Sequence, residues 1–328
     1  MNRKQTLGAS GIAISPLGLG CWAIGGHFTL GGLPDGWGEV DDRQSIEAIH
    51  AAIDMGINFF DTADAYGAGH SETVLGSAVK GRRSEVVIAT KFGFTNNEAA
   101  KEVYLRHDVS PAYVRRSCER SLQRLGTDYI DLYQIHVGSL TAGEIDSVID
   151  SLNRLREEGF IREYGWSTGD PLLAEHFARQ SQAAAFQHSL NVLRDDPEML
   201  SICEKHGLIS INNSPLAMGL LSGKFTQGSQ LPASDVRGSS HEWVQYFKDG
   251  KPVTDYLEKL RAVKEILTSE RRSLVQGALA WIWGRSDATI PIPGFKTKKQ
   301  VQELLGATAF GPLTPSQMEE IERILQPV

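Results

Sequence analysis

Acid–base side chains follow three short apolar runs in the first half of the chain. Asp61 ends the run 57–60, with Tyr66 shortly after it, and Lys91 and His136 follow two further runs. An ammonium group beside a phenol favours the phenolate and lowers the phenol pKa from its usual value of about 10. A carboxylate keeps such a lysine charged, and a histidine can donate a hydrogen bond to a carbonyl oxygen. Together the four side chains predict a proton donor for a developing alkoxide.

Taken singly, each of these residues has an ordinary structural explanation. Lys91 could end a strand in solvent, His136 could be a core histidine, and Tyr66 could lie at a rim. Asp64 and His70, in the same stretch, are typical turn and cap residues, and we expect Asp64 to be structural. Four complementary groups in one pattern favour a catalytic site over four separate structural roles.

The apolar runs alternate with amphipathic stretches, as is typical of an α/β fold with a (β/α)8 TIM barrel. The stretch 42–56 has isoleucines at helical spacing, which predicts a helix. This stretch ends at a glycine, a common helix C-cap, and so do the stretches 110–126, 146–159 and 195–207. Ser110 before a proline predicts a helix N-cap. In such barrels functional residues lie at the C-terminal ends of the strands, where the four candidates occur. The expected strands are 17–20, 57–60, 85–90, 129–135, 161–166, 183–187, 208–212 and 288–292.

A doubly wound sheet is the competing fold. It lacks its usual signature here, because no G-x-G-x-x-G motif follows the first strand and the nearest match, GLGCWA at 18–23, is imperfect. Two irregular segments, 23–40 and 219–251, interrupt the alternation, and the second is long enough to predict a functional lid or wall. No low-complexity linker divides the chain, so we expect one domain over 1–328.

Composition excludes several classes of function. The net charge is −7 and no basic run occurs, which argues against nucleic-acid binding. Segment 5–34 carries no charge, but glycines and Pro16 break it, so we expect no membrane span there. The sequence contains no H-x-H, H-E-x-x-H or C-x-x-C motif, so we expect no metal site. Three widely spaced cysteines favour a reducing cytoplasm.

Seven motifs in order carry a resemblance. They are LGASGIAISPLGLGCW, GINFFDTADAYGAGHSE, ATKFG, RLGTDYIDLYQIH, REYGWS, SPLAMGLLSGKF and IPIPGFKTKKQVQELLGA. With these motifs the chain resembles the aldo-keto reductase family over about 7–303. The resemblance implies a TIM barrel with an N-terminal β-hairpin cap and long βα loops at the C-terminal face. It also implies that NADPH or NADH binds without a Rossmann domain.

The resemblance further implies a catalytic tetrad of Asp61, Tyr66, Lys91 and His136. Tyr66 would be the general acid in carbonyl reduction and the base in the reverse reaction, with Lys91 and Asp61 tuning it and His136 orienting the substrate. Lys296 would favour the 2′-phosphate of NADP. The cofactor-binding positions that match are Gly20, Cys21, Trp22, Asp61, Ser167, Thr168, Gln187, Asn213, Ser214, Pro215, Leu216, Gly219, Leu221, Lys224, Gly294, Lys296, Thr297, Gln300 and Glu303.

Three positions depart from the family pattern. Thr168 stands where many members have asparagine, Asn213 where many have a tyrosine that stacks on the nicotinamide, and Leu304 where an asparagine is familiar. These changes bear on cofactor affinity and preference rather than on the tetrad.

The substrate is expected to be a small carbonyl compound bound by Trp22, Trp37, Tyr66 and His136. The chain has no long stretch after its last predicted helix, so specificity is expected to come from 23–40 and from 219–251 with its aromatic residues. The sequence leaves open which carbonyl compound is used, the physiological direction, and whether the protein is a monomer or a small homo-oligomer.

Two other functions compete with reduction. One is an NADPH-binding, redox-sensing regulatory subunit with little turnover, like the potassium-channel β subunits that resemble this family. The other is a Schiff-base lyase that uses Lys91 as nucleophile and Tyr66 as acid–base. A protonated Lys91 paired with a carboxylate would be a poor nucleophile, which disfavours the lyase.

Overall fold

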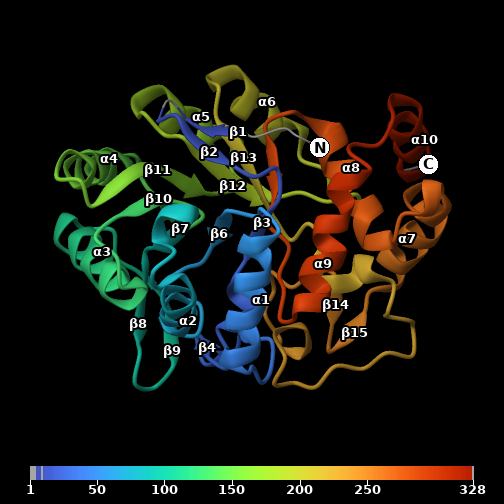
Figure 1. Ribbon diagram of the computed structural model, residues 1–328, viewed down its shortest axis with the longest axis horizontal. Coiled ribbons are helices and arrows are strands. Elements are labelled where there is room, and N and C mark those ends of the chain that lie inside the picture. Colours follow the sequence, from blue (N-terminus) through green and yellow to red (C-terminus); the bar gives the residue numbers. More distant parts are fainter. Residues whose placement is uncertain (1–4, 9, 327–328) are drawn as a thin grey trace.

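Eight parallel strands form the centre of the computed structural model, which describes residues 5–8 and 10–326. Each of the eight predicted strands overlaps an observed one, and helices lie outside the strands (Figure 1). The predicted (β/α)8 barrel is therefore confirmed. In their order around the sheet, the strands are β3 (Gly18–Gly20), β6 (Phe59–Asp61), β7 (Val87–Phe92), β10 (Ile130–Ile135), β11 (Ile161–Ser167), β12 (Ala185–Ser189), β13 (Ile209–Asn213) and β16 (Thr289–Pro291).

A narrow seam joins the first barrel strand to the last. A single parallel bridge pairs Gly20 with Gly294, and the Gly20 N–H donates to the carbonyl oxygen of Pro293 at 3.0 Å. A Cβ atom on Gly20 would lie 2.8 Å from the carbonyl oxygen of Ile292. Glycine is therefore required for the two chain segments to approach and close the barrel.

The helices mostly begin and end at the predicted signals. Gly126 and Gly207 end their helices at φ values of 63° and 66°. Ser110 is the N-cap residue of its helix, as predicted, although its side chain makes no cap bond; its N–H donates to Asp108 Oδ1 at 2.9 Å. The helices are α1 (Asp42–Asp54), α2 (His70–Val79), α3 (Pro111–Leu125), α4 (Ala142–Glu157), α5 (Pro171–Gln180), α6 (Pro197–His206), α7 (Thr254–Leu267), α8 (Leu274–Arg285), α9 (Lys298–Gly306) and α10 (Pro315–Leu325).

An N-terminal hairpin of β1 (Gln5–Leu7) and β2 (Ile12–Ile14) covers one end of the barrel. Leu7 and Ile14 are buried in one apolar cluster with the barrel residues Phe59 and Ile290, among others. Figure 1 shows this hairpin at the upper edge, opposite the edge where β4, β8, β9, β14 and β15 lie. The open end of the barrel is thus left to the segments that follow the strands.

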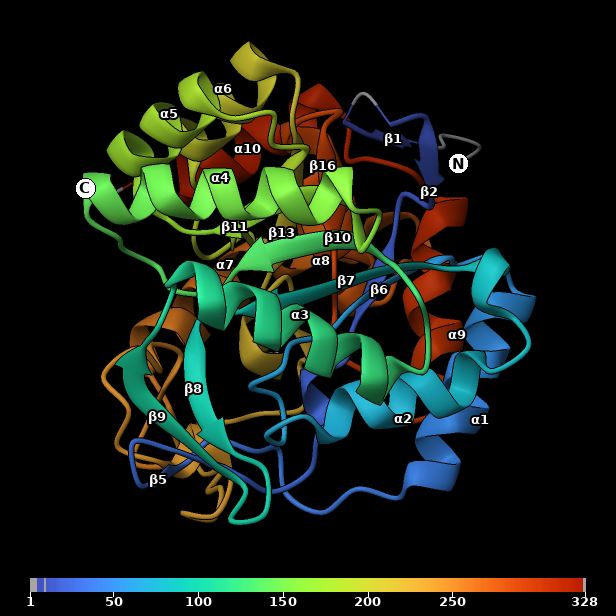
Figure 2. The same ribbon diagram turned by 90° about the vertical axis from the view of Figure 1, so that its left-hand side faces the viewer.

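Additional strands form a small separate sheet at the open end of the barrel. Segment 23–40 contributes β4 (Thr29–Leu30) and β5 (Leu33–Pro34), which join β8 (Phe94–Asn97) and β9 (Glu102–His107) in the order β5-β4-β9-β8. Figure 2 shows β8 and β9 side by side as an antiparallel pair. The sequence did not predict β8 and β9, because residues 94–107 are mostly polar and charged.

Segment 219–251 is largely irregular, as predicted, but short elements of regular structure occur within it. It contains the end of η3 (Ala217–Ser222), η4 (Val236–Gly238), β14 (Phe247–Lys248) and the start of β15 (Lys251–Pro252). The other short turns of helix are η1 (Trp22–Ile24), η2 (Arg83–Glu85), η5 (Ser269–Arg271) and η6 (Ala307–Ala309). Across the described part of the chain, no helix has both the length and the apolar character needed to span a bilayer.

Candidate active site

Lys91 is the centre of the predicted tetrad. Its Nζ donates to Asp61 Oδ1 at 2.5 Å, to the carbonyl oxygen of Thr62 at 2.9 Å and to Tyr66 Oη at 3.2 Å. Asp61 ends β6 and Lys91 lies near the end of β7, two strands that pair in parallel. The parallel pairing therefore brings the carboxylate, the ammonium group and the phenol together at one end of the barrel.

Two glutamines hold the second oxygen of Asp61. Gln134 Nε2 donates to Oδ2 at 3.1 Å and Gln187 Nε2 donates to the same atom at 2.8 Å. Both glutamines are buried, and Gln134 lies directly opposite Lys91 in the pairing of β10 with β7. Gln134 was missed by the sequence reasoning, although a glutamine inside the apolar run YIDLYQI is a signal that could have found it.

His136 follows β10 and faces Tyr66. Its backbone N–H donates to the carbonyl oxygen of Phe92 at 2.7 Å, and its ring meets Tyr66 edge-on with centroids 5.7 Å apart. Burial, with a smaller contribution from Lys91, lowers the His136 pKa to about 3. The ring is therefore neutral at pH 7 and its Nδ1 is buried without a hydrogen-bond partner.

The expected decrease of the Tyr66 pKa is wrong. Burial raises the pKa of Tyr66 by more than the Lys91 charge lowers it, and Asp61 raises it further. Burial alone would lower the pKa of Lys91, but Asp61 and Tyr66 raise it above its usual value. Both groups are therefore protonated at neutral pH, so Tyr66 is a phenol held ready to give a proton.

Asp64 and His70 lie outside this hydrogen-bonded group. Asp64 is buried with one oxygen unpartnered, and burial, then Glu72, raises its pKa well above the usual range. His70 Nε2 lies 2.9 Å from Asp42 Oδ1 at the start of α1. Within the part of the chain that the structure describes, neither side chain makes a hydrogen bond to a tetrad side chain, which agrees with the structural role expected for Asp64.

The residues predicted for the nicotinamide end lie at the ends of neighbouring strands. Ser167 ends β11, Gln187 lies in β12 and Asn213 ends β13. The hydroxyl of Thr168 already has a partner, because its Oγ1 donates to the carbonyl oxygen of Gly138 at 2.7 Å. Cys21 is fully buried in the core, and its N–H donates to the carbonyl oxygen of Asp61 at 2.8 Å, so the structure does not present it to a ligand.

The segment after β13 has a strained backbone. Ser214, Ala217, Met218 and Gly219 have φ values of 51°, 48°, 53° and 90°. Three of these are not glycine, and such strained residues cluster at ligand sites. Asn191 helps to hold the segment, since its Nδ2 donates to the carbonyl oxygen of Ser214 at 2.9 Å. Pro215, Leu216 and Leu221 belong to the same segment, which suits close approach of a ligand to its backbone.

The predicted adenosine end lies between β16 and α9. Gly294 forms the barrel seam, and Thr297 caps α9 in a capping box with Gln300. Gln300 Oε1 accepts from the N–H groups of Lys296 and Thr297 at 2.8 and 3.1 Å. Glu303 is exposed one turn further along. Leu304, where the family pattern has asparagine, is buried in the core at 3% exposure.

Three cations gather near this end. Lys224 and Lys296 each have a pKa lowered first by burial and, in part, by Arg237. Arg237 forms an ion pair with Asp235 at 2.7 Å and lies over the Trp37 ring, 4.6 Å from its centroid. The sequence reasoning missed Arg237, which lies in an irregular segment without a motif. Three cations with one carboxylate suit the phosphates of a dinucleotide.

Aromatic side chains form a wall beside the proton donor. Trp22 stacks on Tyr66 with centroids 5.9 Å apart, Trp37 meets Trp22 edge-on at 5.1 Å, and Trp243 lies 5.7 Å from Trp22. The structure thus brings the predicted substrate residues Trp22, Trp37, Tyr66 and His136 to one place. Trp243 is 44% exposed, so the wall reaches the surface.

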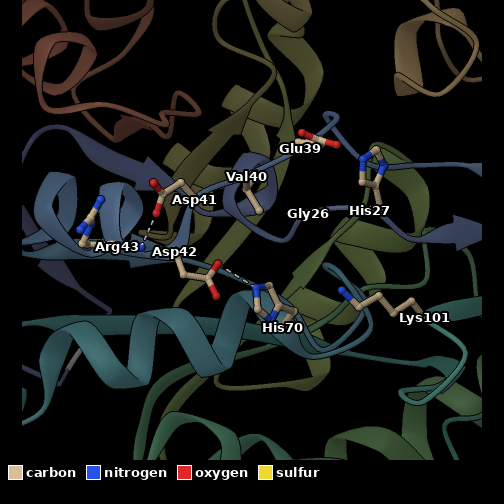
Figure 3. Close-up of a pocket in the computed structure, with 9 residues that line it drawn as sticks. All are labelled: Gly26, His27, Glu39, Val40, Asp41, Asp42, Arg43, His70 and Lys101. Carbon is tan, nitrogen blue, oxygen red and sulfur yellow. Dashed lines mark hydrogen bonds and ion pairs between the residues drawn. The ribbon is translucent and has the colours of Figure 1, made fainter.

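A pocket of about 560 Å³ lies beside segment 23–40 but contains no tetrad residue (Figure 3). Its carboxylates already have partners: Asp42 pairs with His70, and Asp41 Oδ1 accepts from the backbone N–H of Arg43 at 2.9 Å. We therefore do not assign the chemistry to it. The lining residues are Gly26, His27, Glu39, Val40, Asp41, Asp42, Arg43, His70 and Lys101.

Comparisons with known proteins place this geometry in context. The model of the Aldo/keto reductase family matches residues 16–326. The chain is 31% identical over 318 residues to the NADH-specific methylglyoxal reductase of Escherichia coli, covering 93% of each protein. It is 30% identical over 296 residues to the aldo-keto reductase yakc [NADP(+)] of Schizosaccharomyces pombe, covering 87% of this chain and 83% of that one.

A solved structure shares the whole barrel. The glycerol dehydrogenase AKR11B4 of Gluconobacter oxydans is 30% identical and superposes with a TM-score of 0.81, covering 99% of this chain and 97% of that chain. These are the proteins to which the chain is similar in sequence and in fold.

Proposed function

The chain belongs to the aldo/keto reductase family and is an oxidoreductase, and from this premise we propose that it transfers hydride between NADP(H) and an aldehyde or ketone, with Tyr66 as general acid and base. The observation that carries the proposal is the continuous contact from Asp61 through Lys91 to Tyr66, with His136 facing the phenol. A reduced nicotinamide supplies the hydride for the carbonyl carbon when it is bound.

The chain's own residues handle the proton and the charge. Tyr66 gives its Oη proton to the carbonyl oxygen as the alkoxide develops, and the adjacent Lys91 ammonium stabilises the phenolate that remains. Neutral His136 donates a hydrogen bond to the same oxygen and orients the substrate. The products are an alcohol and the oxidised cofactor, and oxidation runs through the same groups in reverse.

Residues at the barrel mouth support a dinucleotide site. Ser167 and Asn213 could contact the nicotinamide end, and the strained turn after β13 could carry the pyrophosphate. We propose NADP over NAD because Lys296 lies at the proposed adenosine end, with Lys224 and Arg237 near enough to add to the positive potential there. The names of the relatives differ in the cofactor: one relative is called NADH-specific, and the name of another includes NADP(+).

The catalytic proposal is tested by NADPH oxidation with a panel of aldehydes and ketones, for the natural protein and for Tyr66→Phe. We expect turnover that the variant reduces by about 10² to 10⁴, the usual contribution of a positioned acid, while NADPH binding persists. Tight NADPH binding without turnover of any carbonyl compound would instead favour a redox-sensing subunit. Absence of binding to either nicotinamide cofactor would overturn the proposal.

The cofactor preference is tested with Lys296→Met, and with Lys298→Met as the matched control at the exposed start of α9. Loss of a charged contact to phosphate costs about 1.5–3 kcal/mol, so NADPH affinity should fall by tenfold or more. NADH affinity should change little, and the control should bind both cofactors as the natural protein does. An equal loss for NADPH and NADH would contradict a 2′-phosphate role for Lys296.

We also propose a cytoplasmic location. Cys21, Cys118 and Cys203 are free and buried, which is consistent with a reducing compartment.

A further inference from the structure

Ser71 is a fully buried serine in the first turn of α2, five residues after the proposed proton donor. Its backbone N–H donates to the carbonyl oxygen of Tyr66 at 3.2 Å. Its Oγ donates to the carbonyl oxygen of Cys21 at 2.8 Å and lies 2.8 Å from Thr62 Oγ1. One small residue therefore ties the start of α2 to three points at the mouth of the barrel.

The direction of each hydrogen bond follows from the donors that are available. A serine hydroxyl has a single proton, and the carbonyl oxygen of Cys21 can only accept. Ser71 therefore gives its proton to Cys21, and the Thr62 hydroxyl donates to Ser71 Oγ. Among the described residues, Ser71 Oγ is the only hydrogen-bond partner of the fully buried Thr62 hydroxyl. Removal of the Ser71 hydroxyl would leave that group unpaired, which is unfavourable in a buried place.

Two of the three points place the groups that handle the proton. The carbonyl oxygen of Thr62 accepts from Lys91 Nζ at 2.9 Å, and the same ammonium group donates to Tyr66 Oη at 3.2 Å. Because Ser71 is bonded both to the Thr62 side chain and to the Tyr66 carbonyl, it holds the cation and the phenol relative to one another.

The third point places the indole that stacks on the phenol. Cys21 directly precedes Trp22, whose ring lies 5.9 Å from that of Tyr66 between centroids. The bond from Ser71 to the Cys21 carbonyl oxygen therefore fixes the backbone that carries this indole.

The loop between Tyr66 and α2 needs such a restraint. Gly67, Ala68 and Gly69 all have positive φ values, 64°, 51° and 96°. A Cβ on Gly67 would lie 2.0 Å from the carbonyl oxygen of Gly25, so the loop packs closely on the end of η1. Backbone of this kind keeps its shape only where its surroundings hold it.

We propose that Ser71 is a positioning residue for the reaction, which sets both the contact of Lys91 with Tyr66 and the stacking of Trp22 on the phenol. This inference rests on the proposed reductase function. The ammonium group stabilises the phenolate that remains after proton transfer. A looser contact stabilises the phenolate less, so the chemical step slows, whereas the residues proposed to bind the cofactor are not altered.

Ser71→Ala tests this role, with two control variants in α4. Ser151→Ala removes another buried hydroxyl, which donates to the carbonyl oxygen of Ser147, and Ile145→Val removes one buried methyl group. With 4-nitrobenzaldehyde and NADPH, Ser71→Ala should lower kcat/KM by about tenfold or more, because small displacements of reacting groups cost up to about 10²-fold. NADPH affinity should be retained, and both controls should keep the natural kcat/KM.

A pH profile separates positioning from a loss of folded protein. In the oxidation of 4-nitrobenzyl alcohol with NADP+, Tyr66 is the base and must first lose its proton. Lys91 lowers the pKa of Tyr66, so a looser contact raises that pKa. The midpoint of the kcat/KM profile should therefore move up by about 0.5–1 pH unit in Ser71→Ala, as expected for one weakened hydrogen bond. A smaller amount of folded enzyme would leave the midpoint where it is.

Thr62→Val is a second, milder variant of the same contact. It keeps the shape of the side chain and the carbonyl oxygen that binds Lys91, but it removes the hydroxyl. The midpoint should move in the same direction by a smaller amount. Added to Ser71→Ala, it should cause no further loss of activity, because it removes the group that the alanine leaves unpaired. It also provides the test if Ser71→Ala folds poorly.

Hydrogen exchange measures the same restraint without cofactor or substrate. The Cys21 N–H donates to the carbonyl oxygen of Asp61 at 2.8 Å, so its exchange reports how firmly segment 18–24 is held. In Ser71→Ala the amides of 18–24 should exchange faster than in the natural protein. In Ser151→Ala their rates should be unchanged.

The outcomes separate the positioning role from the reductase function. An unshifted midpoint in both Ser71→Ala and Thr62→Val would overturn the role of Ser71 and leave the reductase intact. Natural exchange rates over 18–24 in Ser71→Ala would also overturn it, as would an equal fall in kcat/KM in Ile145→Val. If the natural protein reduces neither 4-nitrobenzaldehyde nor any other aldehyde or ketone with either cofactor, both proposals fail.

Discussion

At the scale of single residues, the site depends on one buried charge pair. Lys91 is fully buried and Asp61 is 1% exposed. The ammonium group of Lys91 donates hydrogen bonds to Asp61, Thr62 and Tyr66. Gln134 and Gln187 donate two further hydrogen bonds to Asp61. Such a pair is costly to bury but more costly to break, because removing one partner leaves an uncompensated charge.

Lys91→Met should therefore reduce the free energy of unfolding by about 3–5 kcal/mol. The double variant Asp61→Asn, Lys91→Met removes both charges and should recover a large part of that loss, yet remain unable to reduce carbonyl compounds. Denaturant unfolding measures the stability, and NADPH oxidation measures the activity. A single variant as stable as the natural protein would contradict the pairing energy assigned here.

His136 gives a prediction about acid stability. Its pKa is about 3 in the folded protein and 6.5 as a free side chain. Between these values the unfolded chain binds a proton that the folded protein does not, so stability falls as the pH decreases below 6.5. Between pH 6.5 and 4.5 the His136→Gln variant should lose about 2 kcal/mol less than the natural protein. Urea unfolding across this range checks it, and parallel curves for the two proteins would count against a neutral buried His136.

At the scale of elements, the seam between β3 and β16 controls both barrel closure and the site. It has one bridge, and it lies between Trp22 after β3, which stacks on Tyr66, and Lys296 after β16, at the proposed adenosine end.

Gly20→Ala should destabilise the protein by about 1–3 kcal/mol, because the added methyl group would overlap the Ile292 carbonyl oxygen. Gly143→Ala is the matched control: Gly143 lies in α4, is exposed, and a Cβ there meets nothing within 4 Å. It should leave the stability unchanged or raise it, by at most about 0.5–1 kcal/mol, because Gly143 lies in the first turn of the helix. Thermal unfolding of both variants measures the difference, and equal effects at the two positions would contradict the close approach at the seam.

The sequence predicts the strands and helices of the repeating barrel pattern and misses the residues whose positions no repeat determines. Apolar runs indicate β10 and its neighbours, and the strand ends then place Lys91 and His136. Gln134 is hidden because the sequence does not reveal which polar side chain of a buried strand faces a charge. Arg237 and His241 lie in an irregular segment, where no period fixes the direction of a side chain, and their partners are some 200 residues away.

At the scale of the whole molecule, the first and last barrel strands meet, so residues far apart in the chain complete one ring. We propose that 1–328 is one domain.

Unfolding should therefore occur in one transition, with far-ultraviolet circular dichroism and tryptophan emission changing at the same temperature. Two separated transitions, or a fragment that unfolds independently of the ring, would contradict a single domain.

The cluster of Trp22, Trp37 and Trp243 beside Tyr66 also gives the molecule an optical property. Indoles emit at wavelengths that a dihydronicotinamide absorbs, and the energy passes between them efficiently only at short range. A reduced cofactor that reaches Tyr66 would therefore quench these three tryptophans and emit in their place. If NADPH binds as proposed, tryptophan emission would report whether the bound cofactor is reduced or oxidised, without any added dye.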